Sequence, residues 1–292
     1  MMRSYNKYEC IIFTFGDLIM EKLKRNDRVS VISHVLTSSP NQIFTLNHFC
    51  QMFDAAKSTI SEDIDLVRKC FAKFGLGMIE TVAGAAGGVR YLPFPVNGSL
   101  NFINGVCHKL STKDRVLPGG YLYTNDIMSD PKLVNTMGRL IASQFYRQSP
   151  DFVLTVETKG ISLAMAVANA LGVNAVVAKR DQQQGQDWPF VSINYISGSS
   201  GKIQTMSLAK KLVKEGQRAL IVDDFMKAGG TARGMIEMMS EFSITVVGVG
   251  MMMLREMDVK RRVEDVRSLM IVKNIDEDRG ATVVPAPWIS NL

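Results

Sequence analysis

Apolar residues recur every three or four positions in three segments near the beginning of the chain, and this spacing predicts three helices. The predicted helices cover residues 27–38, 46–53 and 57–73. Two short β-like runs, residues 78–82 and 89–92, flank the glycine-rich stretch AGAAGG, as the strands of a hairpin flank its tip. Three helices followed by a hairpin predict a winged helix–turn–helix.

Strand-like and helix-like segments alternate in the rest of the chain, after Pro93, Pro95 and the Asn97-Gly98 pair, which mark a domain boundary. The predicted strands are residues 152–157, 173–179, 190–196, 218–224, 244–254 and 269–275. The predicted helices are residues 161–171, 206–214 and 230–242. This order predicts an α/β domain in which helices cover a mostly parallel, Rossmann-like sheet.

The chain length of 292 residues favours two domains. We expect the winged helix at residues 20–94 and the α/β domain at residues 95–292. The apolar run at residues 10–20 is too short for a membrane span and lacks the cleavage motif of a signal peptide. Met20 opens a stretch typical of a natural protein start, so we interpret residues 1–19 as an upstream extension.

The composition changes this picture little, since 46% apolar and 21% charged residues are ordinary for a globular protein. The net charge of +6 permits a nucleic-acid partner without requiring one. The four cysteines and three histidines do not cluster, which argues against a zinc site or a disulfide framework and favours a reducing cytoplasm. No segment is apolar for the eighteen or more residues of a membrane span, so we expect no membrane partner.

The stretch IVDDFMKAGGT carries the clearest chemistry of the chain. A predicted strand ends in the adjacent carboxylates Asp223 and Asp224, and a glycine-containing turn leads into a predicted helix. The backbone N–H groups of such a turn can hold a phosphate, and the Thr231 hydroxyl adds a donor. The two acids can accept hydrogen bonds from sugar hydroxyls or hold a divalent cation. The pattern therefore favours a phosphorylated sugar as ligand.

This stretch resembles the binding signature of the phosphoribosyltransferase family, in which an apolar run, two acids and a T-G-G-T type loop bind phosphoribosyl pyrophosphate (PRPP). The resemblance implies that Asp223 and Asp224 bind the ribose hydroxyls. It implies that the 5-phosphate is bound by the loop residues Lys227, Ala228, Gly229, Gly230 and Thr231. It also implies a pyrophosphate loop after an earlier strand, which fits Thr158, Lys159 and Gly160. Lys179 and Arg180, at the end of the next strand, are expected as further phosphate-binding cations.

Two positions depart from the pattern of the purine phosphoribosyltransferases. Lys227 stands where those enzymes often have an aspartate or another residue that handles the proton of the base, and Ala228 replaces the usual threonine. Lys227 can pair with an anionic phosphate but is a poor base at its ordinary pKa. We therefore expect PRPP to be bound as an effector without catalysis. An active purine phosphoribosyltransferase with an added domain is the alternative.

From about Met20 onward the chain resembles the purine operon regulators of Gram-positive bacteria. The motifs that carry the resemblance are AKSTISEDI, INYISGSSGKIQTMSLAKK and VDDFMKAGGT, which occur in that order. The resemblance implies a winged helix joined to a phosphoribosyltransferase-fold domain in a cytoplasmic homodimer. It also implies binding to double-stranded DNA at purine gene promoters, and a response to PRPP or related purine nucleotides in which PRPP weakens DNA binding. Whether Mg²⁺ accompanies PRPP is left open, and no other cofactor is implied.

In a helix–turn–helix the second helix of the motif enters the major groove with its N-terminal residues. The residues that we expect to contact DNA are Lys57, Ser58, Thr59 and Ser61 on that helix, Lys24 and Arg25 before the first helix, and Arg90 in the wing. Lysine and hydroxyl side chains suit both phosphates and base edges. A winged helix that binds RNA or docks on a protein is the remaining alternative.

Overall fold

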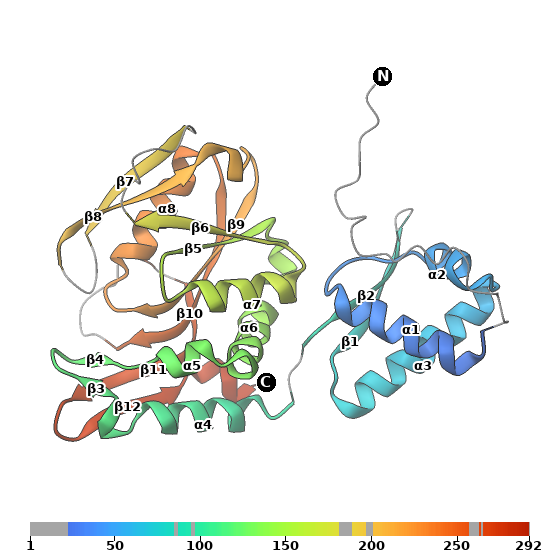
Figure 1. Cartoon of the computed structure of the whole chain (residues 1–292), viewed down its shortest axis with the longest axis horizontal. Coiled ribbons are helices and arrows are strands. Elements are labelled where there is room, and N and C mark those ends of the chain that lie inside the picture. The colour runs from blue at the N-terminus through green and yellow to red at the C-terminus, as the bar shows by residue number, and fades with distance from the viewer. Residues whose placement is uncertain are drawn as a thin grey trace.

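The structure is a computed structural model that describes residues 23–84, 87–94, 97–180, 189–196, 201–256, 263 and 265–291. The expected upstream extension, residues 1–19, and the tip of the predicted hairpin, residues 85–86, lie outside this range. Figure 1 shows the N-terminal helices and hairpin as one group of elements and a larger α/β part beside it.

The N-terminal part has the elements that the apolar spacing predicts. They are α1 (Arg25–Ser38), α2 (Leu46–Phe53), α3 (Lys57–Phe74), β1 (Met78–Val82) and β2 (Gly88–Leu92). The two strands pair antiparallel, and the helices bury Ile32, Phe49 and Ile60 in a common core. Two turns are made by residues in the left-handed region, Asp54 between α2 and α3 and Gly75 after α3. The prediction of a winged helix–turn–helix is confirmed.

The larger part is built on an eight-stranded sheet in the order β12-β11-β10-β9-β5-β6-β8-β7. The strands are β5 (Phe152–Val156), β6 (Asn174–Arg180), β7 (Phe190–Ile196), β8 (Ile203–Ala209), β9 (Arg218–Met226), β10 (Thr245–Arg255), β11 (Val266–Asp276) and β12 (Gly280–Pro285). The five strands from β11 to β6 run parallel, whereas β12, β8 and β7 join antiparallel at the edges. The expected mostly parallel sheet is confirmed.

Helices cover both faces of this sheet. They are α4 (Ser99–Leu110), α5 (Asn125–Ser129), α6 (Pro131–Phe145), α7 (Ile161–Leu171) and α8 (Gly230–Glu241). The 3-10 turns are η1 (Lys113–Arg115), η2 (Tyr146–Gln148), η3 (Lys210–Leu212) and η4 (Pro287–Asn291), and a small hairpin pairs β3 (Val116–Leu117) with β4 (Tyr121–Leu122). Strand β9 contributes Leu220 and Val222 to the core under α4, α6 and α7, and Ala219 and Ile221 to the core under α8. This alternation is the period of two that a strand buried on both faces requires.

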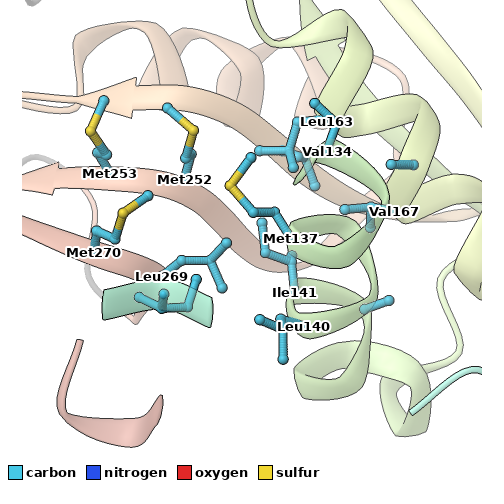
Figure 2. Close-up of a cluster of buried hydrophobic side chains, with 14 of the residues drawn as sticks. Val134, Met137, Leu140, Ile141, Leu163, Val167, Met252, Met253, Leu269 and Met270 are labelled. Carbon is cyan, nitrogen blue, oxygen red and sulfur yellow. The ribbon is translucent and has the colours of Figure 1, made fainter. Parts of the chain in front are cut away.

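Methionine fills much of the core between α6 and the sheet. Figure 2 shows Met252, Met253 and Met270 of the strands on the same side as Met137 of α6. All four side chains are buried. The unbranched thioether adapts to irregular gaps, which explains its use where helices pack on a twisted sheet.

The predicted helix at residues 206–214 is wrong. Residues 203–209 form strand β8, which pairs along its full length with β7, and only a short 3-10 turn follows it. Met206 and Leu208 are buried as alternate residues of that strand, and Ser207 hydrogen-bonds to Ser192 on β7. Pairing with a distant segment therefore overrides the local helical spacing.

The chain passes directly from the smaller core to the larger one at the end of β2. Tyr91 belongs to the core of the winged helix, whereas Leu92 and Phe94 belong to the core under α4, α6 and α7. The Phe94 ring lies 4.8 Å from the ring of Tyr146, centroid to centroid. The connection between the two parts is thus anchored by buried apolar side chains.

Close packing of α6 on α7 requires glycine at position 138, because a Cβ there would lie 2.6 Å from the Cβ of Ala166. We expect Gly138→Ala to lower the free energy of unfolding by about 1–3 kcal/mol. Gly105, an exposed residue of α4, is the matched control, since a Cβ there meets nothing within 4 Å. Gly105→Ala should raise the free energy of unfolding by about 0.5–1 kcal/mol. Thermal unfolding of both variants would contradict this reasoning if the two midpoints moved in the same direction.

Candidate ligand site and nucleic-acid interface

Strand β9 delivers the two adjacent acids to the edge of the sheet where parallel strands end. Asp223 is buried and Asp224 is half-buried, and the strand continues to Met226. The turn that follows reaches α8 through Gly229, whose φ of +82° is the left-handed conformation that favours glycine. The backbone N–H groups at the start of α8 are therefore presented beside the two carboxyl groups, as expected for a phosphate-binding turn.

A cavity of about 320 Å³ opens at this edge of the sheet. The turn and the strand before it line one side with Asp223, Asp224, Lys227 and residues 229–231. The loop after β5 contributes Thr158 and Lys159, and the end of β6 contributes Arg180. Three cationic side chains thus surround two carboxyl groups, which suits a polyanionic ligand that also carries hydroxyl groups.

The carboxyl group of Asp223 is the most perturbed group of the cavity. Its burial, and secondly the neighbouring Asp224 carboxylate, raise the pKa of Asp223 well above its ordinary value. The backbone N–H of Asp224 donates a hydrogen bond of 2.9 Å to Asp223 Oδ1, which opposes this rise. Asp223 is therefore a group that a ligand or cation can stabilise in its ionised form.

Gly160, expected in the pyrophosphate loop, lies behind the cavity wall and contacts Asp223. A Cβ at position 160 would lie 2.4 Å from Asp223 Oδ1 and 2.6 Å from Thr155 Oγ1. The Thr155 hydroxyl is buried without a hydrogen-bond partner. Glycine is thus required at position 160 by the close approach of β9, and the side chains that reach the cavity are those of its neighbours Thr158 and Lys159.

Two cations at the end of β6, Lys179 and Arg180, are expected from the sequence to bind phosphate. Arg180 lines the cavity, whereas Lys179, expected as a phosphate-binding residue, is not among the described residues that do so. Successive side chains of a strand point to opposite faces, and at the end of β6 Arg180 is the one on the cavity side. Ala228 likewise does not line the cavity among the described residues, although Lys227 and Gly229 on either side of it do.

The small hairpin of β3 and β4 forms a wall that sequence analysis did not assign. Its residues Gly120, Tyr121 and Leu122 line the cavity. Arg115 donates two hydrogen bonds of 2.7 Å to the Asp126 carboxylate, which ties the base of the hairpin together.

A second contact fixes the hairpin tip to the far edge of the sheet. The N–H of Gly119 donates to Glu277 Oε1 at 2.9 Å, in the turn between β11 and β12. With Phe225 of β9, Tyr121 gives the cavity an aromatic side next to its charged side. In the sequence this wall corresponds to the turn PGGYLY, residues 118–123.

The residues expected to meet DNA at the start of α3 are accessible. Lys57, Ser58 and Ser61 are exposed, and Thr59 is half-buried. Asp63 on the same helix is 1% exposed and faces α1, where it accepts hydrogen bonds from Arg25 (3.1 Å) and Arg28 (2.7 Å). These ion pairs turn a carboxylate away from the surface on which phosphates would lie.

The two arginines expected to contact DNA are held by intramolecular partners. Arg25 remains half-exposed beside Asp63, and Lys24 just before it is exposed. Arg90 lies in the middle of the hairpin opposite Glu80, to which its Nε donates at 2.6 Å, and its Nη1 donates to Asn41 Oδ1 at 3.0 Å. Arg90 is thus held by partners within the protein, in the middle of the wing hairpin.

Within the described part of the chain, no helix is long and apolar enough to cross a membrane. Over the same residues, no three His, Cys, Asp or Glu side chains are grouped in a way that could hold a metal ion. Asp223 and Asp224 supply two carboxyl groups, the number with which Mg²⁺ is commonly held together with a phosphate-bearing ligand.

Two family models match the chain. Residues 24–93 match the N-terminal part of the bacterial purine repressor, and residues 126–285 match the phosphoribosyl transferase domain. The first match covers the winged helix, and the second contains β5, β6, β9 and α8, which form most of the cavity.

Three similar proteins match most of the chain. A probable purine biosynthesis transcriptional regulator of Streptococcus pneumoniae is 43% identical over 87% of this chain and 93% of its own. A purine biosynthesis transcriptional repressor of Bacillus subtilis is 41% identical over 87% and 90%, respectively. A purine biosynthesis transcriptional activator of Lactococcus lactis is 36% identical over 87% and 94%.

The buried carboxyl group of Asp223 is expected to lower the stability of the protein at neutral pH. Because the pKa of Asp223 is raised, the folded state binds its proton more readily than the unfolded state, so its ionisation lowers stability as pH rises. We expect Asp223→Asn, which keeps the Oδ1 acceptor, to raise Tm at neutral pH by about 2–4 °C, the shift that roughly 1 kcal/mol produces. The gain should shrink in acid, where Asp223 is protonated. A gain that does not depend on pH would contradict the assignment.

Proposed function

The chain belongs to the family of purine biosynthesis transcriptional regulators, and we propose that it binds purine gene promoters through its winged helix and releases them when PRPP occupies the cavity at the end of β9. The observation that carries this proposal is the presence of a winged helix and a cation-lined phosphate cavity on one chain. We place the boundary between the two domains near Leu92, where the chain enters the larger core.

The cavity has a group for each part of PRPP. The turn at residues 229–231 and the start of α8 would take the 5-phosphate, with Lys227 beside it. Lys159 and Arg180 would take the pyrophosphate, and the acids of β9 would accept hydrogen bonds from the ribose hydroxyls. Mg²⁺, when bound, would neutralise part of the pyrophosphate charge and would be held through Asp223 or Asp224.

Among the described residues, the turn after β9 offers no evident base for nucleotide formation. Lys227 is exposed at the point where an enzyme of this fold would often handle the proton of the purine. An ammonium group has no lone pair to accept that proton at neutral pH, whereas it pairs well with phosphate. We infer that the chain binds PRPP without consuming it, in agreement with relatives that are named as regulators.

The DNA side of the proposal rests on the exposed start of α3. A helix–turn–helix places this end of its second helix in the major groove, where Lys57, Ser58 and Ser61 would meet phosphates or base edges. We propose a homodimer, because such motifs commonly read paired half-sites, and a cytoplasmic location with the DNA. PRPP weakens DNA binding only to the extent that it binds the DNA-free form better.

A DNA titration with a purine promoter fragment at fixed salt tests the effector. We expect PRPP to weaken promoter binding by the wild-type protein by about 5- to 150-fold, the usual range for coupled sites. A double variant with Asp223→Ala and Asp224→Ala should bind the promoter and lose this response, because the ribose contacts are gone. The matched control replaces Glu215 and Glu241, two exposed acids, by alanine and should respond like wild type.

Two outcomes would contradict the proposal. A full PRPP response of the double variant would place the effector site elsewhere in the protein. Pyrophosphate release from PRPP and adenine, without promoter binding, would establish an enzyme instead of a regulator.

Lys57 gives a second prediction, on the electrostatic part of DNA binding. We expect Lys57→Ala to weaken promoter binding and to reduce the slope of log affinity against log salt by about one, the loss of one phosphate contact. Lys73, in the last turn of the same helix, is the matched control, and Lys73→Ala should leave the slope unchanged. Equal effects of both substitutions would mean that α3 does not approach DNA with its N-terminal end.

A further inference from the structure

We propose that helix α7 couples the cavity to the winged helix, with Asn41 as the residue that connects the two. This inference rests on the proposed function, since it explains how PRPP at one site would change DNA affinity at another. The two ends of α7 touch the two sites in question, and each end is held by a contact that tolerates little displacement.

The N-terminal end of α7 belongs to the cavity. Gly160 precedes the helix, and its carbonyl accepts the N–H of Ala164 at 2.9 Å. The same glycine is pressed against Asp223, where no methyl group would fit. Thr158 and Lys159, which line the cavity, are the residues immediately before it. A ligand that draws these residues or Asp223 toward itself therefore acts on the first turn of α7.

The C-terminal end of α7 touches the winged helix. Asn41 Nδ2 donates a hydrogen bond of 2.8 Å to the carbonyl of Leu171, the last residue of the helix. The next residue, Gly172, has a φ of +67°, and a Cβ there would lie 2.3 Å from the carbonyl oxygen of Pro40. The backbones of the two domains thus approach each other closely at this point.

Asn41 also forms hydrogen bonds to strand β2 of the wing hairpin. Its backbone N–H donates to the carbonyl of Tyr91 at 2.7 Å, and its Oδ1 accepts from Arg90 at 3.0 Å. Arg90 in turn binds Glu80 on the other strand of the hairpin. Asn41 itself has a φ of +62°, a conformation that asparagine adopts more readily than most residues. One side chain therefore bonds both to α7 and to the hairpin.

The helix between these contacts behaves as a rigid element. Its eleven residues span about 16 Å. Most of them are buried, among them Leu163, Val167 and Ala170, and they pack between α6 and the sheet. Close-packed interiors transmit displacement instead of absorbing it. Figure 1 shows α7 lying along the sheet with the winged helix beyond its end.

The anchored connection at Phe94 supplies the fixed point for such a movement. Phe94 is buried against Tyr146 in the larger core, so the winged helix cannot slide along the connection. Movement of the end of α7 would instead turn the winged helix about this point. Small shifts at an effector site are amplified in this way when an interface has two arrangements.

Two substitutions of Asn41 test the coupling. Asn41→Gly keeps the positive φ and removes both side-chain hydrogen bonds. Asn41→Asp cannot donate to the Leu171 carbonyl yet can still accept from Arg90, so it separates the bond to α7 from the bond to the wing. Asn169→Ala is the matched control, because Asn169 is an exposed amide in the last turn of the same helix.

The measurement is the ratio of promoter Kd values with and without saturating PRPP, for the wild-type protein and the three variants. We expect both Asn41 variants to reduce this ratio by about threefold or more, and Asn169→Ala to keep it. By reciprocity, the ratio of PRPP Kd values with and without promoter DNA must fall by the same factor. Circular dichroism and thermal unfolding establish that each variant is folded.

Three results would decide against the inference. A folded Asn41→Asp variant with the wild-type ratio would show that α7 does not couple the sites through this bond, with the proposed function intact. The same holds if Asn169→Ala reduces the ratio as strongly as the Asn41 variants. A wild-type protein that binds the promoter with no effect of PRPP would remove the proposed effector response itself, and the coupling with it.

Discussion

The cavity depends on a carboxyl group that folding removes from water. Asp223 is 7% exposed at the end of a central strand, beside a second carboxyl group. Burial of an acid in such a place is unfavourable, so it persists only where the surrounding packing holds it. Part of this packing is the loop that bears Thr158 and Lys159, which approaches β9 so closely that position 160 can carry no side chain. The close packing that buries the Asp223 carboxyl group, at a cost in stability, is thus the same packing that shapes the cavity.

The parallel sheet is what makes that arrangement possible. Strands β5, β6 and β9 are neighbours and end at the same edge, so three segments distant in the sequence supply Lys159, Arg180 and the turn before α8 to one cavity. Because β9 is buried on both faces, its position is fixed by α8 on one side and by α6 and α7 on the other. The acids are thus held by the two largest cores of the molecule.

Elements whose burial follows a local period could be predicted from the sequence. Helix α2, helix α7 and strand β7 begin and end where the apolar spacing places them. Strand β8 could not be predicted, because its partner β7 decides its conformation and the spacing of Met206 to Lys214 also suits a helix. The sequence also could not distinguish Lys179 from Arg180 as the residue that lines the cavity, because one residue of error in the position of a strand exchanges its faces. The wall at Tyr121 rests on strands of two residues, too short to show any alternation.

Under the proposed function, Lys227 decides whether the bound ligand is also consumed. An enzyme that consumed its ligand would lower the concentration it encounters, and its occupancy would follow the rate of supply as much as the amount present. Under the proposed function, a cation that holds phosphate without accepting a proton leaves the ligand intact. The fraction of protein with ligand bound is then set by the binding equilibrium alone, and each released ligand molecule can bind again. The side chain of Lys227 would thus distinguish an enzyme that consumes the ligand from a sensor that responds to its concentration.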